Sequence, residues 1–157
     1  MTIQGWLSKA HISCKRRFGL VFEQTKTRAL KLTLSNLVFQ NSGVILRNVR
    51  CFDVVITNCK FVNCREAVVM EQEESRACKR SSLVIADTEF LHNRVSVFVY
   101  LFKELFILTI SRCVFQGKIG RFKVTSDNRN LTGAVYVKAE NTRNSSRGRL
   151  DRRFHIS

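Results

Sequence analysis

The feature that most constrains this chain is a short pattern that recurs four times. The first copy, LTLSNLVFQN, begins at Leu32, and the second, VVITNCKFVN, begins at Val54. Two further copies read LVIADTEFLHN and LTISRCVFQGK, so that each copy alternates apolar residues, turns at Asn, Asp or Arg, and ends near a Phe. Self-similarity at a period of 20–50 residues is typical of repeat architectures. The anchor residues are 22, 29 and 25 positions apart: Phe39, Phe61, Phe90 and Phe115.

A second short apolar run follows each anchor after a polar gap. These runs read GVIL, AVVM, VSVFVY and, at a longer distance, GAVYV, and an earlier GLVF precedes the first copy. Their Val, Ile, Leu and Phe content favours strands. The stretch from Val95 to Ile110 is split by Lys103 and Glu104, which suits two buried strands joined by a turn. The polar stretches 71–82 and 116–130 are interpreted as loops that leave one corner.

Three short strands in a unit of 22–29 residues can make one turn of a coil. One such turn cannot bury its own apolar face, whereas stacked turns can. We therefore expect successive turns to pair in parallel about 4.8 Å apart. Leu32 and Phe39 of one turn are then predicted to point inward and to stack on Val54 and Phe61 of the next.

The residue between the two halves of each copy is expected to sit where the chain bends. Asn36, Asn58 and Asp87 suit such a corner, because Asn and Asp tolerate left-handed backbone angles and form local hydrogen bonds. Arg112 departs from this residue preference in the fourth copy.

Five of the six cysteines divide into two groups by their place in the repeat, and the sixth is Cys14. Cys59 and Cys113 occupy an inward template position and are predicted to be small buried hydrophobic residues. Cys51, Cys64 and Cys78 lie in joining segments and are candidates for a disulfide, although six cysteines allow 15 pairings and the sequence does not choose. Their spacing does not match a zinc site.

The Phe-anchored repeat resembles the right-handed parallel β-helix of pectin-lyase-like proteins. The resemblance spans about 2–140, and the runs TIQGW and GAVYV are similar to coil strands of large, non-catalytic extracellular animal proteins with this domain. It implies an all-β, right-handed parallel β-helix (a solenoid) of about five short coils, incomplete at its ends, over 2–140. A basic disordered tail is expected over 141–157. An antiparallel β-sandwich also uses many short strands, but it would not repeat one template at each step.

The charge of the chain favours anionic partners. The 157 residues carry a net charge of +15, which is typical of chains that meet nucleic acid, acidic polysaccharide or a membrane surface. A solvated surface with a basic tail is the simpler alternative. The candidate polyanion-binding residues all lie in the tail and are Arg143, Arg147, Arg149, Arg152 and Arg153.

The sequence favours a chain without catalysis, although an enzyme is not excluded. A polysaccharide hydrolase needs two carboxylates that face one groove, and the 12 acidic residues show no such pairing. Glu71, Glu73 and Glu74 form an acidic group that is interpreted as a solvated loop, and the three histidines have no metal-ligand spacing. No catalytic residue, metal ligand or cofactor is therefore predicted.

The compartment is predicted to be extracellular, within a longer parent protein. Asn130 and Asn144 open two Asn-X-Ser/Thr motifs and are candidate glycosylation sites. The N-terminus does not read as a signal peptide, and no apolar stretch reaches the length of a membrane span. Because a solenoid needs capped ends, the uncapped coil pattern is read as a fragment of a secreted protein.

Three function classes follow from these observations. The first is a non-catalytic structural or binding module that takes glycans or other extracellular proteins. The second is a polysaccharide lyase or hydrolase, supported by fold-level analogy alone. The third is nucleic-acid or polyanion binding through the basic surface, supported by the net charge.

Overall fold

The computed structural model describes residues 2–4, 10–13, 19–23, 30–72, 80–101, 105–116, 122–126, 135–140 and 143–144. Regular structure in these residues consists of β-strands, which form three parallel sheets. We call them sheets A, B and C in the order in which the chain visits them.

The strands of each sheet lie far apart in the sequence. In order across sheet A they are β1 (Thr2–Gln4), β4 (Leu30–Ser35), β7 (Phe52–Thr57), β10 (Arg80–Ala86), β13 (Leu105–Ser111) and β16 (Val135–Glu140). Sheet B holds β2 (Ala10–Ser13), β5 (Leu37–Gln40), β8 (Lys60–Val62), β11 (Glu89–Leu91), β14 (Val114–Gln116) and β17 (Arg143–Asn144). Sheet C holds β3 (Leu20–Glu23), β6 (Val44–Val49), β9 (Glu66–Gln72), β12 (Val95–Leu101) and β15 (Phe122–Ser126).

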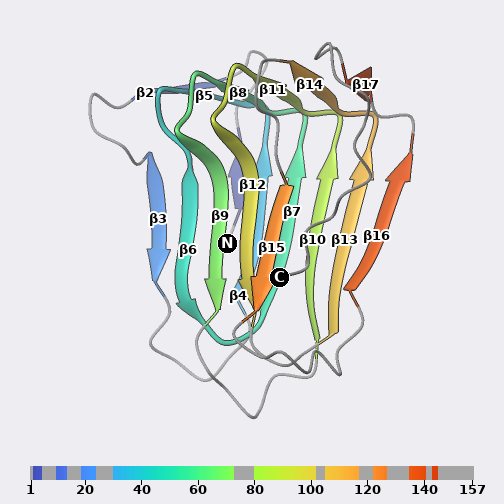
Figure 1. Ribbon diagram of the computed structural model, residues 1–157. Helices are drawn as coiled ribbons and strands as arrows, with labels where there is room; N and C mark the ends of the chain where they lie inside the picture. The colour runs from blue at the N-terminus through green and yellow to red at the C-terminus, as the bar shows by residue number, and fades with distance from the viewer. Residues whose placement is uncertain are drawn as a thin grey trace.

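The chain passes from sheet A to sheet B to sheet C and then returns to sheet A one strand further along. Figure 1 shows sheets A and C as two walls of longer strands, with the short strands of sheet B across the top. Every pairing between the described strands is parallel, as in β4 with β7 and β7 with β10. The predicted all-β parallel solenoid is therefore confirmed, and the alternative of an antiparallel sandwich is wrong.

The structure establishes about three turns of the roughly five that the repeat predicts. The strands from β4 to β12 form these three turns, in which the strands and their A–B and B–C corners are described together. The strands β1–β3 and β13–β17 extend the same sheets on either side.

The register places like residues of successive turns on top of one another. Leu32 pairs with Val54, and Leu83 pairs with both Val54 and Leu108, so that one inward column crosses four strands of sheet A. All four side chains are buried. Because burial of apolar surface is the main favourable term in folding, this column fixes which face of sheet A points inward, as the alternating pattern predicted.

The four anchor phenylalanines form one column on the inner face of sheet B. Phe39 and Phe61 stack with ring centroids 4.7 Å apart, Phe61 and Phe90 with 5.1 Å, and Phe90 and Phe115 with 4.8 Å. The rings are parallel within 5°. Each spacing matches the separation of neighbouring strands, so the ring stack and the backbone ladder enforce the same register.

The second half of the fifth turn differs from the sequence prediction. Residues 122–126 form β15 in sheet C, where a polar loop was predicted. The GAVYV run was assigned to the same turn, but β16 pairs with β13 and begins the next passage through sheet A. The polar run that contains β15, FKVTS, gave too weak an apolar signal, and its strand pairs with β12 through the backbone.

The structure also corrects the predicted bounds of one loop and of the C-terminal tail. Glu71 and Gln72 end β9, and Arg80 begins β10, so strands take up both ends of the loop predicted at 71–82. Arg143 and Asn144, which the prediction assigned to the tail, form β17 beside β14. Residues 73–79 and 145–157 lie outside the described part of the chain.

The Phe column supplies a test of the stacked core. Phe61→Ala should lower the free energy of unfolding by about 3–5 kcal/mol, because it leaves a cavity between two stacked rings. Val21→Ala, at a side chain that is 47% exposed, should change it by no more than about 0.5 kcal/mol. Urea unfolding followed by circular dichroism measures both. Equal losses in the two variants would show that the Phe column is not the core of the fold.

Candidate functional site

The tight corners within the described part of the chain are formed by residues with left-handed backbone angles. Between sheets A and B, the φ angles of Asn36, Asn58, Asp87 and Arg112 lie between 49° and 56°. The sequence predicted this corner for the first three residues. Arg112 departs from the predicted residue type but adopts the same backbone conformation, because the parallel register of sheets A and B leaves the fifth turn, from β13 to β14, the same path.

Side-chain bonds compensate for this strain along the A–B corner. The Asn58 side-chain amide donates to Asn36 Oδ1 over 2.6 Å. The Arg112 guanidinium donates to both carboxylate oxygens of Asp87, over 2.6 and 2.7 Å. These bonds from Arg112 hold the pKa of the Asp87 carboxyl below its usual value of 3.8. A non-Gly residue in this conformation costs about 1–2 kcal/mol, and the bidentate pair offsets part of that cost at Arg112.

The corner between sheets B and C repeats the same device. Asn41, Asn63 and His92 have φ angles of 56°, 54° and 56°, and their side chains are exposed. This second column was not predicted from the sequence. The signal was present as the Asn, Asn and His found two positions after each of the first three anchors.

The B–C corner widens by two residues after the first fully described turn. Asn41 lies three positions before Val44, whereas Asn63 lies five positions before Val68, the residue that pairs with Val44. The fourth turn keeps the wider corner, because Val97 pairs with Val68. The extra residues include Arg65 and Arg94, and both side chains are exposed.

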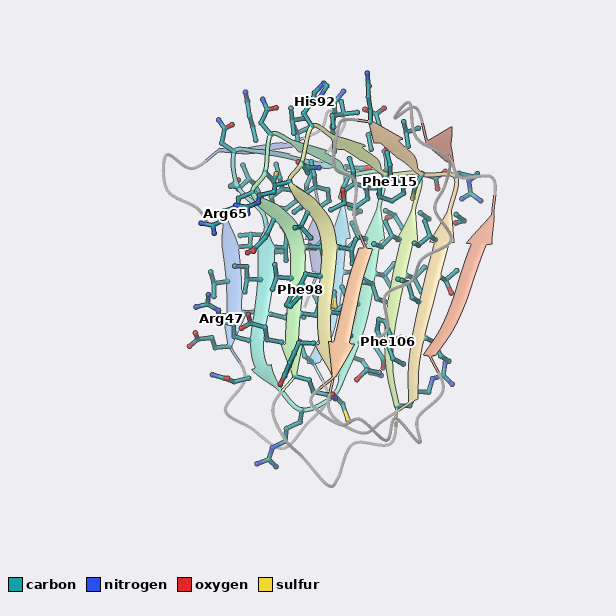
Figure 2. All side chains as sticks on the ribbon, in the orientation of Figure 1. Arg47, Arg65, His92, Phe98, Phe106 and Phe115 are labelled. Atoms are coloured by element: carbon teal, nitrogen blue, oxygen red, sulfur yellow. The ribbon has the colours of Figure 1, made fainter. Side chains whose placement is uncertain are left out.

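Arg65 and Arg94 occupy equivalent positions on adjacent turns. The Arg94 amide donates to the Cys64 carbonyl over 3.0 Å, and the Val95 amide donates to the Arg65 carbonyl over 3.0 Å. The strand register beyond this point pairs Val95 with Glu66. We call the exposed side chains of this corner the B–C ridge: Asn41, Asn63, Arg65, His92 and Arg94. Figure 2 labels Arg65 and His92 on its outer side, at the upper corner of the solenoid.

Buried polar groups hold the B–C ridge from inside. Asn93 is 5% exposed; its Oδ1 accepts a hydrogen bond from the Cys64 amide over 2.8 Å, and its side-chain amide donates to the Phe61 carbonyl over 3.1 Å. The Cys64 thiol donates to the Ser42 carbonyl over 2.8 Å. Three successive turns are thereby linked below the ridge, and buried satisfied networks of this kind give rigid local structure.

The buried thiols lie in the core and donate to backbone carbonyls. Burial raises the pKa of the Cys64 thiol to about 11 and also raises that of Cys113. Cys59 and Cys113 are fully buried, as the template predicted. Cys64 was a candidate for a disulfide, but it is a free buried thiol because its side chain turns inward at the B–C corner. Cys51 is disulfide-bonded.

Several carboxylates in the described part of the chain are engaged by neighbouring turns. Asp53 accepts from the Ser82 hydroxyl over 2.8 Å, and Glu89 Oε2 lies 2.9 Å from Lys60 Nζ. Glu71, from the acidic group that the sequence singled out, lies 3.5 Å from Arg47. Glu73 and Glu74 lie outside the described residues. No three His, Cys, Asp or Glu side chains come together as metal ligands within the described ranges.

The predicted site residues are only partly within the described chain. The register pairs Arg143 with Val114, and Asn144 with Phe115. The other candidates lie outside the described residues, so the glycosylation and polyanion predictions for them stay predictions: Asn130, Arg147, Arg149, Arg152 and Arg153. The described part of the chain contains no helix with the length and hydropathy that a membrane crossing requires.

Comparison with known proteins adds no relative. No protein-family profile, no curated protein and no solved structure matches this chain. The functional argument therefore depends on the residues and geometry of the chain itself.

The close approach of two backbones at the B–C corner can be tested at Gly43. A Cβ atom there would lie 2.1 Å from the Glu66 carbonyl oxygen and 2.6 Å from that of Ala67. Gly43→Ala should lower the free energy of unfolding by about 3 kcal/mol, the upper range for overpacking. Gly19→Ala is the matched control, since a Cβ atom there would lie 3.0 Å from the Ser42 hydroxyl and 3.2 Å from the Gly43 carbonyl oxygen, so that a much smaller displacement admits the added methyl group. Thermal melts of both variants compare their stabilities. A Gly43→Ala variant as stable as the wild type would contradict the close approach of Gly43 to the backbone of Glu66 and Ala67.

The Asp87–Arg112 pair predicts a dependence of stability on acid pH. Because the folded-state pKa of Asp87 is lowered, the pair stabilises the fold above pH 3.8, and this stability is lost as pH falls through the folded pKa. Asp87→Asn keeps a residue that tolerates the corner. It should cost at most about 1 kcal/mol at pH 7, because the pair is exposed. Urea titrations between pH 7 and pH 2 should show the two proteins converging at the acid end. If the difference in unfolding free energy between the two proteins stays constant from pH 7 to pH 2, the Asp87 carboxylate is not its cause.

Proposed function

We propose that this chain is a non-catalytic β-solenoid module that binds glycans along its B–C ridge. The observation that carries this proposal is the column of exposed Asn41, Asn63 and His92 side chains. The three residues repeat once per turn, about 4.8 Å apart, on a corner that buried bonds hold rigid. A linear polymer with repeating hydroxyl groups is the ligand class that such a straight row of hydrogen-bonding groups fits.

An extracellular setting is part of the same proposal. Cys51 is disulfide-bonded, and disulfides persist mainly in oxidising compartments. The motifs at Asn130 and Asn144 would carry N-linked sugars in that setting. The finer assignment to the right-handed, pectin-lyase-like class of extracellular proteins also belongs to this proposal and is supported by the Phe-anchored repeat.

Cleavage of a polysaccharide is the weaker alternative. A glycoside hydrolase places two carboxylates about 5–10 Å apart across its substrate. Among the described residues, the carboxylates of Asp53, Asp87 and Glu89 are each bonded to a side chain of a neighbouring turn. Glycan binding without cleavage therefore accounts for the described surface more simply.

A glycan array with the whole chain tests the proposal. The protein should bind a subset of linear glycans, and Asn63→Ala together with His92→Ala should weaken that binding, because both remove ridge groups. The matched control is Asn36→Ala, which removes an asparagine side chain from the A–B corner. Product analysis of the bound glycans should show no shortening. Binding that survives loss of the ridge groups, or glycan cleavage at a rate that follows protein concentration, would contradict the proposal.

A further inference from the structure

We propose that Arg65 and Arg94 together form a binding subsite for a sulfate group of an acidic glycan. This inference rests on the proposed glycan-binding function and adds the chemical class of the ligand and the residues that select it. Neither arginine belongs to the basic tail that the sequence singled out.

The register places Arg65 and Arg94 at neighbouring backbone positions on adjacent turns. Val95 donates to the Arg65 carbonyl, and Arg94 donates to the Cys64 carbonyl, so the two backbones run in register at the corner. The Arg65 and Arg94 side chains therefore start from neighbouring positions about 4.8 Å apart, one strand spacing. Both are exposed, and a guanidinium presents a fork of donors that fits the oxygens of an oxyanion.

The charge balance at this corner is different from that elsewhere on the solenoid. The ion pairs of the described residues engage other cations, namely Arg47, Lys60 and Arg112. Two like charges directly opposite on adjacent strands destabilise a sheet. A bound anion between Arg65 and Arg94 would remove that repulsion, so binding is favoured beyond the direct attraction of each charge.

Glu66 is the acidic residue of this corner, and it limits the local positive charge. It follows Arg65 directly and pairs in the strand ladder with Val95. Its removal should therefore strengthen binding of an anion, which gives the proposal a variant with an effect of opposite sign.

The selectivity of the subsite must come from side chains. The amides of Asn63, Arg94 and Val95 are already bonded to carbonyls of adjacent turns, so they cannot form an anion-binding nest. The hydrogen bonds of the buried Asn93 side chain to Cys64 and Phe61 fix the backbone that carries the arginines. Two long arginine side chains that start from a rigid backbone can both reach one compact anionic group.

A sulfated glycan fits this subsite better than a nucleic acid does. Proteins that bind single strands combine a basic groove with aromatic side chains on which bases stack. The B–C ridge offers asparagine, arginine and histidine, and none of its five residues is Phe, Tyr or Trp. The ridge also holds one pair of arginines, whereas nucleic-acid binding engages many phosphates in succession.

The test compares heparin affinity of the whole chain and of Arg65→Gln/Arg94→Gln by isothermal titration at several salt concentrations. The double variant should bind at least tenfold more weakly, and its salt slope should fall by about two, one for each lost ionic contact. The matched control is Lys31→Gln/Arg80→Gln, which removes the same charge at exposed positions of sheet A and should leave the affinity within about twofold. Circular dichroism confirms that all variants are folded.

Two further variants and two further probes separate the outcomes. Arg65→Lys/Arg94→Lys keeps the charge but loses the fork, so its affinity should fall between wild type and the Gln variant, and Glu66→Gln should bind more tightly. Hyaluronan, which has carboxylates and no sulfate, should bind the wild type more weakly than heparin, and single-stranded DNA should not compete. Equal losses in the Gln variant and the Lys31/Arg80 control would overturn the subsite. Binding of neutral glycans without heparin binding would also overturn it and would leave the proposed function standing, whereas a chain that binds no glycan would overturn both.

Discussion

Parallel register between successive turns is the constraint on which the rest of the structure depends. It places Phe39, Phe61, Phe90 and Phe115 in one column with rings 4.7–5.1 Å apart. A slip of one residue would move every side chain to the opposite face of its sheet, so the buried column and the backbone ladder permit one alignment. The same register that aligns the core also aligns everything outside it, including the exposed corners.

Because of that register, the corners of successive turns form rows of side chains on the surface. Left-handed residues recur at the A–B and B–C corners of successive turns, and their side chains form straight rows on a rigid support. In the A–B row, side chains of adjacent turns hydrogen-bond to one another: Asn58 donates to Asn36, and Arg112 donates to Asp87. Both rows lie on the surface, but among the described residues the asparagine and histidine side chains of the B–C row form no such bond with one another, and the wider part of this row adds two exposed arginines. This difference is why the B–C ridge, and not the A–B corner, carries the functional proposals.

At the B–C corner, buried polar side chains hold the backbone from inside, and neighbouring side chains are exposed to solvent. Asn93 bonds the Cys64 amide and the Phe61 carbonyl on the inside of the turn, while Arg94 is exposed on the outside. Unsatisfied polar groups in a core are costly, so these bonds are a condition for the chain to turn there at all. Buried side chains that hold the backbone and exposed side chains therefore follow one another directly at this corner.

Sequence alone was sufficient for the coil and for the inward faces, because strand alternation and the Phe period are local patterns that repeat. It identified Leu32, Val54 and the Phe column as core, and it assigned Asn36, Asn58 and Asp87 to a corner. It missed β15, whose run FKVTS has little apolar signal and is held by pairing with β12. The juxtaposition of Arg65 and Arg94 was decided only by tertiary structure, since residues 29 positions apart meet through the length of an intervening turn. Local sequence sets what each residue prefers, but turn length sets which residues become neighbours.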